Sequence, residues 1–191
     1  MLDKNLNLVQ QVGDLSVHHR LIDYNCFKQN YRLINKIGMQ IIRDDSMLLM
    51  PKTALFALND AAGHDIDLSR AKPSDIETIE TNDKRQLEKD IAFLGEIKRM
   101  TNVVTPSNGN YEPLPLVQAL QANIITDEQF DNVLSSVIFF IVMTYTDLAN
   151  PERIAWVLKN YGSQTTSLNC MEWINSLPKL TQGAPTAKKK A

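Results

Sequence analysis

Few residues in this sequence combine the types and spacing that catalysis requires. His18 and His19 precede Cys26 by eight and seven residues, so His19 and the thiol would share a face if this segment were helical. Two helical turns separate them by about 10 Å along the axis, too far for the hydrogen bond that activates a nucleophile. Cys26 also stands between Tyr24 and Phe27, as buried structural cysteines do. We therefore expect no cysteine nucleophile.

Patterns for metal and phosphate chemistry are also missing. Residues 64–67, His-Asp-Ile-Asp, form the one run that mixes histidine with acids, and their spacing matches no calcium or zinc loop. The seven glycines make neither Gly-x-Gly-x-x-Gly nor a Walker loop, and no Gly-x-Ser-x-Gly elbow occurs. The sequence predicts a protein that is not an enzyme and has no cofactor, metal site or catalytic residue. An active site that only the fold assembles remains the alternative.

Binding residues are easier to nominate than catalytic ones. Lys28, Arg32, Lys36 and Arg43 fall on one side of a predicted helix, beside its apolar stripe. We call these four residues the basic ridge. It would suit an acidic protein partner or a phosphate backbone. The alternative is a solvated face whose charges pair with acids from elsewhere in the fold.

Aromatic residues near the C-terminus are the other candidates for partner binding. Trp156 and Tyr161 lie in one predicted helix and Trp173 in the next, and both helices are apolar on more than one face. Because tryptophan is enriched in interface hot spots, we expect at least one of the two rings to contact a partner. The alternative is that both tryptophans complete the core. The connection is short, so we expect the two helices to be neighbours.

Helical periodicity dominates the N-terminal half. Apolar residues recur every three or four positions from Tyr24 to Ile41, which predicts a helix that begins near Ser16 or His18. Residues 39–50 form either a short β-hairpin around Asp44–Ser46 or a continuation of this helix to Arg43. Further helices are predicted at 53–62 and 84–104.

The C-terminal half follows a stretch rich in turn-forming residues. Residues 106–115 contain Asn-Gly and three prolines, so we predict a linker there, between a helical subdomain at 1–105 and another at 116–180. Residues 126–145 predict a buried central helix, with a buried strand at 137–146 as the alternative. Two shorter helices follow, and 181–191 is predicted to be a disordered basic tail. The fold class expected is mainly α: a compact, all-alpha multi-helix domain with at most one short β-hairpin near residues 39–50.

Composition limits the class of protein. The chain has 191 residues, a net charge of −2, 43% hydrophobic and 22% charged residues, typical of a soluble globular protein. The longest apolar run, from Val133, is about 13 residues, short of the roughly 20 that span a bilayer. We expect no membrane insertion, and the lack of a secretory signal and the two cysteines favour a cytoplasmic location.

These observations lead to two hypotheses about function. The first is a non-catalytic protein–protein interaction module, such as an adaptor, a chaperone or an assembly factor of a larger complex, acting on another protein or by self-association. The second is a nucleic-acid-binding protein that uses the basic ridge and the lysine tail. A net charge of −2 disfavours a general nucleic-acid coat.

Overall fold

A computed structural model describes residues 6–43, 50–64, 66–71, 74, 84–107, 110–146 and 151–178. The strands are β1 (Asn7–Val12), β2 (Leu15–Arg20), β3 (Thr101–Ser107), β4 (Asn110–Pro115) and β5 (Ser163–Thr166). The helices are α1 (Tyr24–Arg43), α2 (Met50–Ala62), α3 (Lys84–Arg99), α4 (Leu116–Gln121), α5 (Asp127–Thr146), α6 (Pro151–Asn160) and α7 (Cys170–Ser176).

The strands form one antiparallel sheet in the order β4-β3-β2-β1-β5. A two-residue turn joins β1 to β2, and its first residue, Gly13, has a φ of +60° that a side chain would disfavour. The fold is therefore mixed α/β, and the expectation of a mainly α, all-alpha protein is wrong. The β1–β2 hairpin is where that expectation first fails, because Ser16 and His18 belong to β2 and the first helix begins only at Tyr24.

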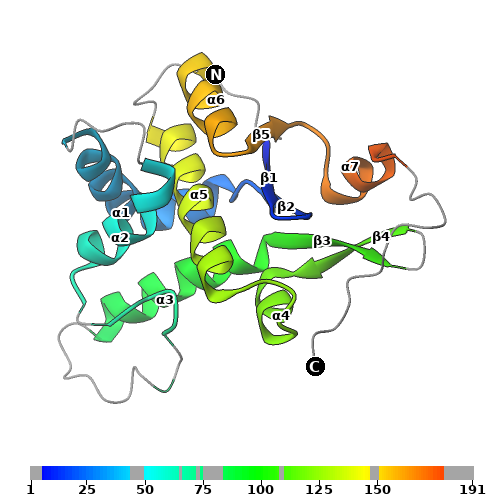
Figure 1. Ribbon diagram of the computed structural model, residues 1–191. Coiled ribbons are helices and arrows are strands. Elements are labelled where there is room, and N and C mark those ends of the chain that lie inside the picture. Colours follow the sequence, from blue (N-terminus) through cyan, green and yellow to red (C-terminus); the bar gives the residue numbers. More distant parts are fainter. Residues whose placement is uncertain are drawn as a thin grey trace.

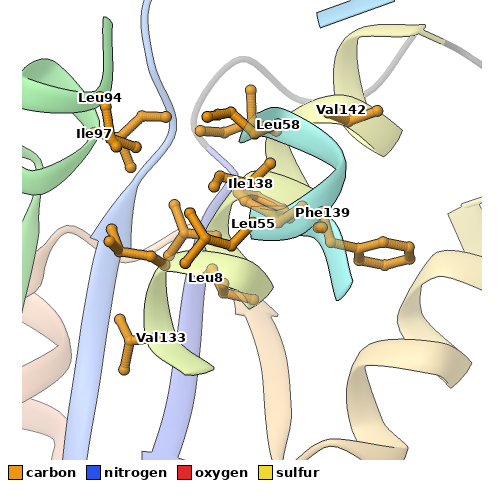
Figure 2. Packing of buried hydrophobic residues seen from close by; sticks show 14 of the residues in the cluster. Leu8, Leu55, Leu58, Leu94, Ile97, Val133, Ile138, Phe139 and Val142 are labelled. Carbon is orange, nitrogen blue, oxygen red and sulfur yellow. The ribbon is translucent and has the colours of Figure 1, made fainter. Parts of the chain in front are cut away.

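The helical core lies against one face of the sheet (Figure 1). Helix α5 packs against α1 and α2 on one side and against β1 on the other. Nearly all of its inward positions are apolar, from Phe130 to Met143, and they are buried. Figure 2 shows Ile138 of this helix beside Leu55 and Leu58 of α2 and near Leu8 of β1, while the Phe139 ring points away from them; all five belong to the main core. The predicted central helix is confirmed, and the alternative strand at 137–146 is excluded.

The opposite face of the sheet carries a second, smaller apolar cluster. Alternate strand residues point to opposite faces, so Leu8 belongs to the main core while Val9 points the other way. Val9 and Val104 pack there against Trp173 and Ile174 of α7. We call this cluster of four residues the α7 face. It explains why β1 is buried on both sides and shows no simple alternation of apolar and polar residues.

Three further expectations about local structure change. Residues 39–43 continue α1, so the alternative of a longer helix holds and the hairpin near 39–50 is wrong; the turn proposed at 44–46 lies outside the described residues. The helix predicted at 84–104 ends at Arg99, and Val104 lies in β3. Residues of the segment predicted as a linker, 106–115, lie in the β3–β4 hairpin. The predicted tail at 181–191 lies outside the described residues.

Among the described helices, none combines the length and the apolarity that a membrane span requires.

Candidate functional site

Helix α1 separates its residues into a buried and an exposed side. The buried side contains Leu33, Ile34, Ile37 and Ile41, which repeat at helical spacing and join the main core. The exposed side contains polar, basic and apolar residues together: Lys28, Tyr31, Arg32, Asn35, Lys36 and Met39. The sequence pattern predicted Tyr24 and Tyr31 within the apolar stripe, but their exposed fractions are 66% and 47%. That part of the predicted stripe is wrong, because the core-facing row runs through residues 33, 37 and 41.

An open groove lies where α1 meets α2. It has a volume of about 630 Å³ and is lined by Tyr31, Arg32, Asn35, Lys36, Met39, Gln40, Asp60 and Ala61. The Lys36 ammonium lies 3.4 Å from the Ala61 carbonyl oxygen, near the C-terminal end of α2. Gln40 donates a hydrogen bond to Asp60, so the one carboxylate that lines the groove already accepts a partner. We define the α1–α2 surface as these lining residues together with Lys28 and Phe56.

Exposed apolar side chains give this surface its character. Met39 is 65% exposed and Phe56 is 73% exposed, and Phe56 lies one helical turn before Asp60 on the same side of α2. Single exposed apolar residues are normal on soluble proteins. Here Tyr31 and Met39 line one groove, and Phe56 is next to it along α2. A grouping of this kind is typical of an interaction site.

The basic side chains on this surface do not pair with acids from elsewhere in the described fold. The ion pairs in that part of the chain join His64 to Asp90, Arg70 to Asp127 and Asp131, and Arg99 to Glu96. None of them includes Lys28, Arg32 or Lys36. The side chain of Arg43, the fourth member of the predicted ridge, is outside the described part of the structure.

The predicted aromatic candidates do not come together with this ridge. Trp156 is 56% exposed on α6, whereas Tyr161 is partly buried against the main core. Trp173 is only 7% exposed and packs on the far face of the sheet, with its ring 6.0 Å from that of His18. Helices α6 and α7 follow one another in sequence but are separated by β5 and lie at different places on the sheet (Figure 1).

The two adjacent histidines point to opposite faces of the sheet and serve its packing. The Thr101 hydroxyl donates its proton to the Ile97 carbonyl oxygen, so at the 2.9 Å contact it must accept from His19 Nδ1. His19 Nε2 is then an unprotonated acceptor, buried without a hydrogen-bond partner. Burial, with a smaller contribution from the charge of His18, lowers the pKa of His19 to about 3. His19 is therefore neutral at physiological pH.

His18 anchors the loop that precedes α7. Its Nε2 lies 3.1 Å from the Leu168 carbonyl oxygen, and the Asn7 side chain donates to the same oxygen at 3.0 Å. Burial lowers the pKa of His18, which keeps this ring neutral too. Trp173 covers the His18 ring, so this arrangement does not leave His18 open to a substrate as a general base.

The remaining reactive side chains are also held in structural contacts. Burial raises the pKa of the Cys26 and Cys170 thiols, which disfavours the reactive thiolate. The side chain of His64 is buried against Asp90, with 2.9 Å between His64 Nε2 and Asp90 Oδ2. Asp90 also accepts from Gln86 at 2.8 Å. The described residues contain no group of three or more His, Cys, Asp or Glu side chains that could hold a metal ion.

A charged cluster at the N-terminal end of α5 was not visible in the sequence. Arg70 bridges Asp127 and Asp131 at 3.1 and 3.0 Å, and its guanidinium stacks 4.9 Å from the Phe130 ring centre. Lys98 donates to the Ser69 carbonyl oxygen at 2.8 Å. These contacts fasten the 66–71 loop to α3 and α5 and leave no obvious reactive group free.

No protein family, curated protein or solved structure matches this chain, so the site rests on its own geometry.

Proposed function

We propose that this protein is a non-catalytic interaction module, an adaptor or assembly factor, that binds another protein through the α1–α2 surface. The observation that carries the proposal is the groove in which exposed Tyr31 and Met39 stand beside Arg32 and Lys36. Interfaces are enriched in aromatic residues, methionine and arginine relative to the rest of a protein surface. Methionine adds adaptability, since its unbranched side chain fits partners of irregular shape.

The surface is built on rigid elements, which favours binding without large rearrangement. Helices α1 and α2 both contribute to the main core, through Ile34 and Ile37 on one and Leu55 and Leu58 on the other. Their exposed sides are therefore held in place by packing underneath. A partner that covers the exposed apolar atoms would gain their burial at a small ordering cost in this chain.

The experiment is a pull-down from the source organism with the full chain as bait. We expect the wild-type chain to retain a protein partner that the double variant Tyr31→Ala/Met39→Ser loses. The matched control is Val117→Ser/Ile124→Ser, which removes two apolar residues that are exposed to 38% and 40% near α4, outside the groove. Equal retention by the wild type and the groove variant would contradict the proposal.

Nucleic-acid binding is the second candidate, and one observation favours it. Exposed Tyr24 and Tyr31 accompany Lys28 and Arg32 along α1, and single-stranded nucleic acids bind to basic grooves with stacking aromatic rings. A labelled 20-nucleotide single strand would then bind with an affinity that falls steeply as salt rises. Weak binding with a shallow salt dependence would eliminate this candidate.

A further inference from the structure

We infer that the partner segment recognised by the α1–α2 surface is an acidic amphipathic peptide. It would place apolar side chains in the groove and carboxylates on the basic side chains of α1. This inference rests on the proposed function and names the chemistry of the partner.

The spacing of the basic residues defines the matching ligand. Lys28, Arg32 and Lys36 follow one another at intervals of four residues, so they form a row with about 6 Å between neighbours. A second helix with acidic residues at the same interval presents carboxylates at the same spacing. A helix that lies in a groove and is anchored every three to four residues is a recurring mode of peptide recognition.

The electrostatics of the groove favour anions on the partner. Arg32 and Lys36 line it and have no ion-pair partner among the described residues, and these two cations outnumber the single carboxylate of the lining, Asp60, which accepts a hydrogen bond from Gln40 and keeps its charge. Helix α1 contains no acidic residue along its length. A basic or neutral segment would leave these cations without compensation in the contact, and a like charge would cost affinity.

The groove also requires an apolar component. Tyr31, Met39 and Ala61 present carbon surface at its walls, and Phe56 continues that surface along α2. A purely acidic chain such as polyglutamate would leave this surface in water. An acidic amphipathic segment satisfies both requirements. A single-stranded nucleic acid could stack bases on the tyrosines but has no aliphatic groups for Met39 and Ala61, and the overall charge of −2 disfavours its approach.

The test is a selection of random 16-residue displayed peptides on the full-length chain. Enriched peptides should carry net negative charge, with acidic residues three or four positions apart and aliphatic or aromatic residues between them. Their affinity should fall at least about tenfold in Arg32→Glu/Lys36→Glu and should also fall in 0.5 M salt. The matched control is Arg85→Glu/Lys89→Glu, the same change at two exposed residues of α3, and it should alter affinity by less than about twofold.

The outcomes separate this inference from the proposed function. If the enriched peptides lose binding in Tyr31→Ala/Met39→Ser but show no acidic bias, the acidic partner is refuted and the α1–α2 surface stands. If no peptide is enriched, or if binding survives that variant, both claims fail. A labelled 20-nucleotide strand that binds this surface more tightly than the best peptide overturns the acidic-peptide assignment in favour of nucleic acid.

Discussion

The α1–α2 surface and the α7 face of the sheet look alike in sequence and differ in what covers them. Each contains large apolar or aromatic side chains, and polar residues adjoin them: Arg32 and Lys36 in the groove, His18 beside Trp173. On the α7 face, the chain itself covers the apolar atoms: Trp173 and Ile174 close over Val9 and Val104, and each is at most 7% exposed. On the α1–α2 surface, Met39 and Phe56 remain more than 60% exposed.

Polar contacts explain why α7 stays closed. The Leu168 carbonyl oxygen accepts from His18 and Asn7, which fixes the chain just before the helix. Asn169 and Glu172 then form a capping box that satisfies backbone amides at the first turn. The groove between α1 and α2 has no such cover among the described residues. The comparison shows that a cluster of apolar residues indicates a binding partner only where no other part of the same chain covers it.

The largest effect that distinguishes the two regions is expected at the tryptophans. Trp173→Ala removes a buried ring and should lower the free energy of unfolding by about 3 kcal/mol, measured by urea denaturation. Trp156→Ala removes a ring that is 56% exposed and should change it by less than about 0.5 kcal/mol. Comparable losses in both variants would mean that α6 is covered as well as α7.

Acid should weaken the sheet and leave the α1–α2 surface unchanged. The pKa of His19 is about 3 in the folded chain and about 6.5 when unfolded, so between these values the unfolded chain binds more protons. The free energy of unfolding should therefore fall as pH falls below about 6.5, by up to about 1.4 kcal/mol per pH unit. The lowered pKa of His18 acts in the same direction.

Urea denaturation at pH 7 and pH 5 measures this effect. His19→Leu should reduce the dependence, since it removes one of the two histidines that take up a proton on unfolding. Peptide binding should change by less than about twofold, because the α1–α2 surface contains no histidine and the carboxylates of the peptide remain largely ionised at pH 5. A wild-type stability that does not change between pH 7 and pH 5 would contradict the burial of His19 as a neutral ring.

A smaller effect is expected at the start of α7. Asn169→Ala removes the side chain that accepts from the Glu172 amide at 3.0 Å, and loss of a helix cap costs about 1 kcal/mol. The intrinsic fluorescence of Trp173, followed in a Trp156→Phe background, should shift to longer wavelength at lower urea in this variant. An unchanged transition would show that the cap contributes nothing to closing the α7 face.

The helices were largely predictable from sequence and the sheet was not. The α5 segment and the α6 segment, with Pro151 at its start and Gly162 after its end, carry strong local signals of helix. The strands do not, because β1 is buried on both faces and β5 is only four polar residues long. The paired strands are also far apart in the sequence. Leu8 of β1 pairs with Thr165 of β5, and a local sequence pattern carries no information about so distant a partner.

The candidate site was predictable in part for the same reason. The spacing of Lys28, Arg32 and Lys36 marked one side of α1, and that side is exposed; its role in binding stays a prediction. The groove could not be predicted, because it depends on how Asp60 and Ala61 of α2 approach α1. The sequence analysis nominated Trp173 as an interface residue because it did not predict the sheet, and it is the sheet that buries this ring.

Oxidative footprinting of methionine, with and without a selected acidic peptide, is the direct test of whether the partner binds the α1–α2 surface. The chain contains its own controls: Met39 is 65% exposed on the α1–α2 surface, Met171 is 53% exposed on α7, and Met143 is 1% exposed in the core. In the free chain we expect Met39 and Met171 to oxidise readily and Met143 to resist. Bound peptide should protect Met39 several-fold and leave Met171 unchanged. Protection of Met171 with unchanged oxidation of Met39 would contradict binding at the α1–α2 surface and place the partner on α7.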